Sequence, residues 1–199
     1  MGITERKIRH KKNLKVAILE TAWNIVKEEG WEALSIRKIA DAIEYSVPVI
    51  YSHFENKEAI LSEISLEGFR HLQNLLTKAG KKYTDPKDQL KAYAETYWNF
   101  AFRNKEYYML MFGLGMPSCC TSGKPPEEIF AFKNCIAGAV EKIMKSRNSN
   151  MDDFHFKKFA FWSVLHGLIS IRFMRNNDIG DTMNKKVMED TVASFLKNL

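Results

Sequence analysis

The segment SVPVIYSHFENKEAIL, residues 46–61, combines features that neither an ordinary helix nor a loop explains. Pro48 stands in a run whose two flanks both have the apolar spacing of helices. Ser46 is a favourable N-cap residue, and proline is tolerated in a first helical turn because its missing N–H would have no partner there. We therefore expect a very short helix over residues 47–53, with Ile50 and Phe54 directed inward.

The side chains left outside this short helix fit a surface that reads DNA. A short exposed helix, preceded by a four-residue turn and an amphipathic helix, has the shape of a recognition helix in the major groove. Pro48 and Val49 can contact thymine methyl groups, while Tyr51 and Ser52 offer hydrogen bonds. Lys57, at the start of the following helix, can hold a phosphate. The alternative is a structural helical hairpin that contacts no DNA.

Most of the remaining sequence has the periodicity and end signals of helices, so we expect an all-α chain of about nine helices. Ser35, Asn56 and Asp85 are expected N-caps, and Gly30 and Gly80 are expected stops. Residues 113–126 form the one long predicted loop. The predicted helices, besides the two of the helix-turn-helix, cover 11–29 (with Val16, Leu19, Trp23 and Val26 inward), 56–80, 85–104, 105–114, 126–147, 151–176 and 181–198.

Composition and charge exclude several classes of protein. Hydrophobic residues make up 45% and charged residues 27%, as in soluble globular proteins, and the longest apolar-rich run, 159–171, is shorter than the roughly 18 residues a membrane span needs. No apolar segment typical of a signal peptide follows the N-terminal charges, and three cysteines form neither a disulfide framework nor a metal pair, so we expect a cytoplasmic protein without metal or cofactor. No P-loop, dinucleotide fingerprint, GxSxG or HExxH motif is present, which argues against an enzyme. The net charge is +6, with six of the cations between residues 6 and 15, a basic arm that is either a solvated tail or a contact for a polyanion.

The stretch SIRKIADAIEYSVPVIYSHFENKEAIL, residues 35–61, resembles the N-terminal domain of the TetR-like family of bacterial transcriptional regulators. Ser35, Ile39-Ala40, Ser46, Tyr51, Phe54 and Lys57-Glu58 follow the family pattern without gaps, within a similarity that covers about residues 12–62. The resemblance implies a helix-turn-helix domain, residues 1–58, and a ligand-binding and dimerisation domain, residues 59–199. By the same resemblance, the residues facing DNA are Ser35, Arg37, Ser46, Val47, Pro48, Val49, Tyr51, Ser52, His53 and Lys57.

The turn of the helix-turn-helix departs from the family pattern. This chain has Glu44-Tyr45 where the family usually has Gly-Val. Glu44 must then adopt the turn conformation without the freedom of glycine, at a cost of about 1 kcal/mol. Tyr45 is larger than the usual aliphatic residue.

The C-terminal two-thirds carries a dense aromatic segment, residues 93–112, that predicts either an aromatic core or a ligand cavity. Because the family generally binds a small molecule in this domain, we favour a cavity for a neutral or weakly polar effector with a mostly apolar or aromatic body. Trp162, His166 and Gly167 also resemble the Trp-His-Gly signature of one C-terminal subgroup, although a lone histidine on such a helix is commonly a core residue. The candidate ligand residues are Tyr93, Tyr97, Trp98, Phe100, Tyr108, Met111, Phe112, Phe159, Trp162 and His166.

Two further helices predict a homodimer. Residues 154–174 are apolar nearly all round from Phe159 onward, Gly167 indicates close approach by a neighbour, and the last helix has a one-sided apolar stripe. Together with their symmetry mates they would form a four-helix interface. The stripe consists of Val187, Met188, Val192, Phe195, Leu196 and Leu199.

The predicted function is a ligand-responsive repressor that a small apolar effector releases from a palindromic operator in double-stranded DNA, with no membrane partner. A thiol- or redox-sensing regulator that uses Cys119, Cys120 and Cys135 is the alternative. A protein-interaction module would show no salt-dependent binding to duplex DNA.

Overall fold

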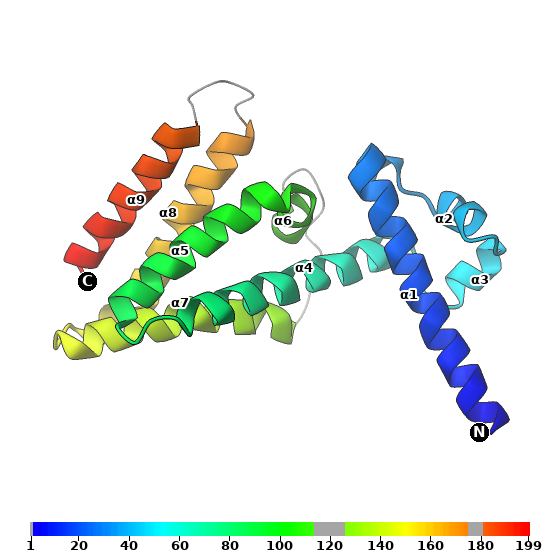
Figure 1. The fold of residues 1–199 in the computed structure, drawn as a ribbon, viewed down its shortest axis with the longest axis horizontal. Coiled ribbons are helices and arrows are strands. Elements are labelled where there is room, and N and C mark those ends of the chain that lie inside the picture. The colour runs from blue at the N-terminus through cyan, green and yellow to red at the C-terminus, as the bar shows by residue number, and fades with distance from the viewer. Residues whose placement is uncertain (1, 114–125, 175–180) are drawn as a thin grey trace. The chain divides into compact units, whose positions relative to one another are not determined.

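The computed structural model describes residues 2–113, 126–174 and 181–199, and these residues form nine α-helices, two short 3-10 helices and no strand (Figure 1). The all-α prediction of about nine helices is therefore confirmed. The α-helices are α1 (Ile3–Glu29), α2 (Ile36–Ala42), α3 (Val47–Tyr51), α4 (Lys57–Gly80), α5 (Pro86–Arg103), α6 (Lys105–Phe112), α7 (Glu127–Ser146), α8 (Phe154–Met174) and α9 (Asp181–Lys197). The 3-10 helices are Trp31–Ala33 and Met151–Asp153.

The chain divides into two compact units. The N-terminal unit comprises Met1–Gly68 and Glu106–Ser122, and the C-terminal unit comprises Phe69–Lys105 and Gly123–Leu199. The division falls inside α4 and before most of α6, so each unit is assembled from two separate stretches of sequence. The boundary at residue 58 between a DNA-binding and a ligand-binding domain stays a prediction about function.

The core of the N-terminal unit is built on one face of α1. Leu14, Ile18, Ala22 and Val26 are buried there, whereas the expected Val16 is 45% exposed. The predicted stripe was therefore wrong at Val16, and Leu19 and Trp23 pack only partly against the core. Against this face lie side chains from the short helices and from α4 and α6, namely Leu34, Ile39, Ala40, Ile50, Phe54, Ile60, Leu61, Ile64 and Leu110.

Helix α6 contributes to the same core, although it follows α5 directly in the chain. The rings of Tyr107 and Trp23 stack with their centroids 3.8 Å apart, and Leu110 is almost fully buried. A Cβ added to Gly68 would lie 2.7 Å from the sulfur of Met111, so α4 and α6 approach closely at this glycine. These contacts explain why α6 belongs to the N-terminal unit.

The C-terminal unit is a helical bundle in which α5 packs against α7, α8 and α9. The rings of Tyr97 on α5 and Phe132 on α7 stack at 5.8 Å, and α8 buries Phe161, Leu165 and Ile169 on one face. Helix α9 buries Met188, Val192, Leu196 and Leu199 on its inner side, and in Figure 1 it runs beside α8. Within the described residues, no helix is both long and apolar enough to cross a membrane.

Candidate functional site

The helices around the recognition segment begin where local hydrogen bonds fix them. The Ser35 hydroxyl accepts the N–H of Lys38 at 3.1 Å, and the Asn56 side-chain oxygen accepts the N–H of Ala59 at 2.8 Å. Both residues are therefore caps, as the sequence indicated. Ser46 occupies the N-cap position of α3, but its side chain makes no capping hydrogen bond, so its hydroxyl is not held by the helix end.

The turn between α2 and α3 has the strained conformation that its sequence implied. Glu44 has φ of +59°, in the left-handed region that non-glycine residues rarely occupy. The turn is closed by the Tyr45 N–H, which donates to the Ala40 carbonyl at 3.0 Å. The Tyr45 ring is 40% exposed, so this larger side chain lies at the surface instead of filling the core.

Helix α3 is even shorter than predicted, at five residues, and it is anchored from one side. Ile50 is fully buried and Phe54 nearly so, which confirms their inward direction. Pro48, Tyr51 and Ser52 face solvent, with Tyr51 52% exposed. The Ser52 hydroxyl donates to the Val49 carbonyl at 2.7 Å, which leaves its oxygen lone pairs to accept a further hydrogen bond.

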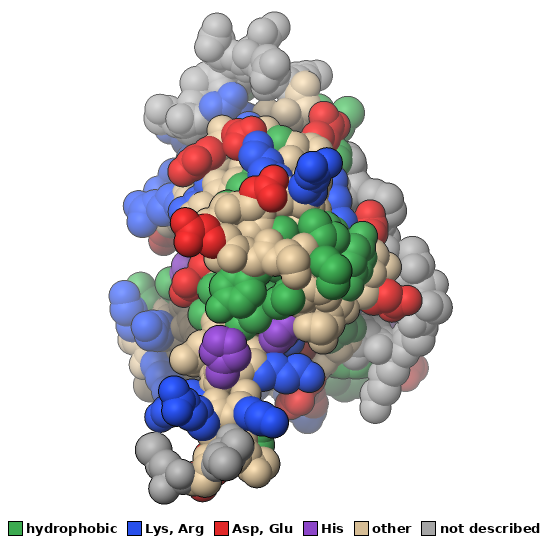
Figure 2. Space-filling view, turned by 90° about the vertical axis from the view of Figure 1, so that its right-hand side faces the viewer, with side chains coloured by type: hydrophobic (Ala, Val, Ile, Leu, Met, Phe, Trp, Pro, Cys, Tyr) green, Lys and Arg blue, Asp and Glu red, His purple; other side chains and the backbone are tan. Residues whose placement is uncertain are grey.

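The other predicted DNA-facing residues lie around this helix with unequal exposure. Ser35, Arg37 and Ser46 are exposed, whereas Val47, Val49, His53 and Lys57 are half-buried. Val47 and Val49 pack partly against the core, so their methyl groups are shared between the core and the surface. On this face of the N-terminal unit, Figure 2 shows a central group of hydrophobic side chains, with His, Lys and Arg below it and a mixture of acidic and basic side chains above it.

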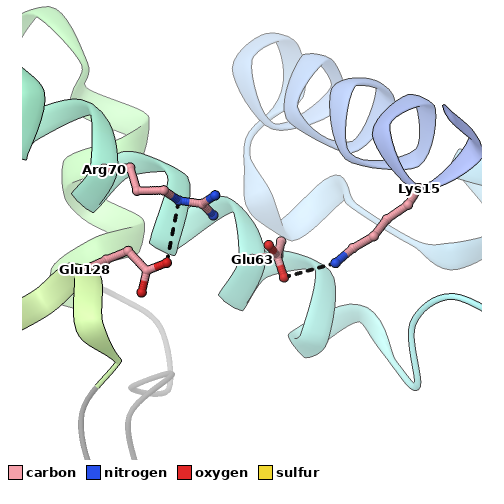
Figure 3. A network of polar contacts seen from close by, with 4 residues as sticks. All are labelled: Lys15, Glu63, Arg70 and Glu128. Atoms are coloured by element: carbon pink, nitrogen blue, oxygen red, sulfur yellow. Dashed lines mark hydrogen bonds and ion pairs between the residues drawn. The ribbon is translucent and has the colours of Figure 1, made fainter. Parts of the chain in front are cut away.

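His53, immediately after α3, lies in a positive electrostatic environment. Burial, together with the charges of Lys11, Lys15 and His10, lowers the pKa of His53 below its ordinary value. Lys15 also forms an ion pair with Glu63 at 3.4 Å (Figure 3). The Lys15 ammonium group lies over the Phe54 ring, 5.5 Å from its centroid. The N-terminal half of α1 is thereby placed beside the end of the recognition helix.

The predicted ligand residues are distributed over two separate units. Tyr93, Tyr97, Trp98 and Phe100 are buried on α5 in the C-terminal unit. Tyr108, Met111 and Phe112 lie on α6, in the N-terminal unit. Phe159, Trp162 and His166 lie on α8, with Phe159 64% exposed.

Within the C-terminal unit, a polar pair connects α5 to α8. The Tyr97 hydroxyl lies 3.2 Å from Nδ1 of His166, and Nε2 of His166 lies 3.5 Å from the Ser170 hydroxyl. The Trp162 ring stacks on the His166 ring at 4.9 Å, and burial lowers the pKa of His166. A neutral imidazole held on both nitrogens fits this environment, so His166 has the properties of a satisfied core histidine.

A cavity of about 310 Å³ opens beside this cluster, between α7 and α8, at the lower end of the size range of small-molecule sites. Two of the predicted ligand residues, Phe159 and Trp162, line it, and none of the α5 residues does. Its other lining residues, which the sequence interpretation missed, are Phe130, Phe132, Lys133, Asn134, Ile136, Ala137 and Lys158. The exposed Phe130 was the available signal, because it stands outside the buried stripe of α7.

The thiol alternative finds little support in the described part of the chain. Cys119 and Cys120 lie outside the described residues. Cys135 is a half-buried free thiol, and burial raises its pKa. A thiol with a raised pKa is mostly protonated at neutral pH and is a weak nucleophile. Elsewhere in the C-terminal unit, Arg70 and Glu128 form an ion pair at 3.7 Å (Figure 3). Among the described residues, no group of three or more His, Cys, Asp or Glu side chains could hold a metal ion.

Taken with its fold, this arrangement defines a helix-turn-helix DNA-binding protein. The family model for the tetR family of bacterial regulatory proteins matches residues 18–64. The chain is 26% identical over 165 residues to the HTH-type transcriptional activator FasR of Mycolicibacterium smegmatis, covering 81% of this chain and 72% of FasR. Residues 18–64 accordingly form a helix-turn-helix domain of the tetR type, and over most of its length the chain is similar to a transcriptional regulator.

Solved structures of similar fold extend over almost the whole chain. The TetR family regulator PfmR of Thermus thermophilus superposes with a TM-score of 0.62 at 24% identity, covering 90% of this chain and 97% of PfmR. The regulator FadR of Bacillus subtilis, solved in complex with stearoyl-CoA, has a TM-score of 0.67 at 13% identity, covering 92% and 98%. At these identities the similarity shows the fold alone.

Proposed function

We propose that this protein is a dimeric, effector-responsive regulator that represses transcription from a palindromic operator and is released by a small apolar molecule. The observation that carries the DNA-binding part is the five-residue α3, anchored by Ile50 and Phe54 and presenting Pro48, Tyr51 and Ser52 to solvent. A helix this short cannot be stable alone, and a proline-containing surface fixed on a rigid core suits close approach to base edges.

Phosphate contacts would surround this reading surface. Lys57 is the first residue of α4, where a cation and free backbone N–H groups can hold one phosphate together. On the other side of α3, the exposed Arg37 on α2 and the cap residue Ser35 can hold phosphates of the second DNA strand.

Dimerisation through α8 and α9 is supported by apolar side chains that the protomer leaves uncovered. Val164, Ile171 and Val187 are at least 40% exposed on these helices. Apart from its chain neighbours and the nearby backbone of its own helix, no described atom comes within 4 Å of a Cβ built on Gly167, so this face of α8 has room for a second protomer to approach closely. Leu196, by contrast, is buried within the protomer and would not test the interface cleanly.

The effector site that we favour is the cavity between α7 and α8. Its walls are mostly aromatic and aliphatic, and two of its residues, Phe132 and Trp162, also pack on the Tyr97–His166 pair. A ligand that moved Trp162 would therefore act on the hydrogen bond that joins α5 to α8. The Bacillus subtilis FadR was solved with stearoyl-CoA, and the long acyl chain of that ligand supports an effector with an apolar body, although its CoA part is anionic. The name of FasR, an activator, makes the sign of regulation a specific question for experiment.

The first test is selection of binding sites from a random duplex pool by the purified protein. We expect an enriched palindrome with half-sites about one helical turn apart, bound in a salt-dependent manner. Enrichment of no sequence, or binding that does not weaken with salt, would contradict DNA reading by α3.

The second test uses Trp162 as a reporter. Apolar compounds such as decanol should quench tryptophan fluorescence and release the selected duplex, and Trp162→Phe should remove that quenching. Decanoate serves as the charged comparison, because Lys133 and Lys158 also line the cavity. If only decanoate releases DNA, the neutral character of the effector is wrong; if neither ligand perturbs Trp162, the cavity is not the effector site.

A further inference from the structure

The first three turns of α1 form a helix without a core. The described side chains from Thr4 to Asn13 are all exposed, and even Ile8 is 64% exposed. Among the described side chains of α1, Leu14 is the first buried one. Packing against a core therefore does not stabilise the helical conformation of these first turns, and short helices without such packing are only marginally stable in water.

The charges of this stretch make it less stable when the protein is free. Lys7, Lys11 and Lys15 follow one another at intervals of four residues, which places them on one face as like-charged neighbours. The single acid in the first three turns, Glu5, is occupied at the helix start, where it accepts the N–H of Gly2 at 3.1 Å. A helix with uncompensated positive charge and no core is stabilised by a polyanion that lies along it.

The position of Lys7, Lys11 and Lys15 (the lysine row) relative to α3 indicates which polyanion they bind. Lys15 lies over the Phe54 ring, 5.5 Å from its centroid. The charges of Lys11 and Lys15 both lower the pKa of His53, so both lysines lie near this residue. Both aromatic residues directly follow the recognition helix. From there the row Lys7–Lys11–Lys15 extends for about 12 Å, given a rise of 1.5 Å per residue.

We propose that the row Lys7, Lys11 and Lys15 is a second DNA-binding element, which holds backbone phosphates next to the half-site that α3 reads. The proposal rests on the proposed function, because it needs α3 on DNA. The three lysines precede the segment that the family model matches, which begins at residue 18. Since phosphates carry no base identity, the row adds affinity and lengthens the contacted DNA without adding sequence preference.

The experiment compares two charge-matched double variants on the selected duplex. Lys7→Gln/Lys11→Gln removes the two outer cations of the row, while Arg9→Gln/Lys12→Gln removes two cations that lie mainly on other faces of the same helix. Lys15 is left intact because it is paired with Glu63. All four positions are exposed, so both variants should unfold at the temperature of the wild type.

For a dimer, losing two phosphate contacts per protomer should make the slope of log K against log salt less steep by about 3.6. The fall in affinity between 50 and 200 mM salt should then be about 150-fold smaller for Lys7→Gln/Lys11→Gln. Arg9→Gln/Lys12→Gln should keep a slope close to that of the wild type. Lengthening the duplex flanks from two to eight base pairs should strengthen wild-type binding and leave the row variant almost unaffected.

Equal slopes for the row variant and the wild type would overturn the proposal, as would equal losses in both variants, which would mean a diffuse charge effect. A flank dependence that survives in the row variant would also overturn it. Those failures leave palindrome selection by the wild type intact. Absence of palindrome selection would instead remove the proposed function and this inference together.

Discussion

The strained turn before α3 gives the sharpest prediction about stability. Glu44 has φ of +59°, and a non-glycine residue in this region is destabilised by about 1–2 kcal/mol relative to a relaxed conformation. Glycine avoids that strain, but its more flexible unfolded chain offsets about 0.4–1 kcal/mol. Glu44→Gly should therefore stabilise the protein by about 0.5–1 kcal/mol, raising Tm by roughly 2–3 °C for a chain of this size.

The assay is thermal unfolding followed by circular dichroism, with Glu44→Ala as the matched control. Alanine removes the same carboxylate but keeps the strain, so its Tm should stay near that of the wild type. Glu44→Asn should fall between the two, because asparagine tolerates the left-handed region better than most residues. If alanine stabilises as much as glycine, the exposed carboxylate is responsible and the argument from backbone strain is refuted.

Four further predictions concern single positions. Lys57→Ala should weaken binding to all duplexes and lower the salt slope by about one unit per protomer, whereas Val49 substitutions should change which bases are preferred; an unchanged slope in a folded variant would exclude Lys57 from the phosphate contacts. The pKa of His53 is lowered in the free protein, and a nearby DNA phosphate would raise it. DNA binding should therefore take up a proton and become stronger as the pH falls from above the pKa of His53 in the complex to below its pKa in the free protein. His53→Gln should reduce this pH dependence, and an undiminished pH dependence in that variant would rule out His53 as its source. Gly80→Ala should destabilise by about 1–3 kcal/mol, because its Cβ would lie 2.2 Å from the Tyr93 hydroxyl, while Gly138→Ala meets no atom within 4 Å and should be neutral or stabilising; equal unfolding temperatures would contradict this close approach. Ile171→Asp should give monomers in sedimentation, whereas Val16→Asp, at similar exposure on α1, should not; a dimeric Ile171→Asp would place the interface elsewhere.

Features set by neighbouring residues could be predicted from the sequence. The caps at Ser35, Asn56 and Asp85 depend on one side chain and an N–H two or three residues away, and all three are present. The positive φ of Glu44 follows in the same way from a four-residue turn that lacks glycine. The start of α1 could not be predicted, because its first turns carry no apolar stripe to mark a helix.

Features set by distant elements were harder to predict. The aromatic residues of α5 were expected to line a cavity, but Tyr97 stacks on Phe132 and is buried by packing against α7. The cavity lies where α7 and α8 leave a gap, and of the seven lining residues that the sequence interpretation missed, only Phe130 stands out from the apolar stripe of its helix. Similarly, the stripe of α9 was assigned to the dimer, whereas Met188, Val192 and Leu196 are buried within the protomer. Periodicity identifies an apolar face but not the element that covers it.

Because α6 belongs to the N-terminal unit, this DNA-binding unit cannot be separated from the rest of the chain by a single cut after α4. A fragment that ends after α4 would lose the ring of Tyr107 from the face of Trp23 and leave the place of Leu110 empty. Removing a buried leucine alone typically costs about 2–5 kcal/mol, a large part of the stability of a small helical unit. A chimera that joins this DNA-binding unit to another sensor domain would therefore have to include residues 105–112 as a second, non-contiguous segment.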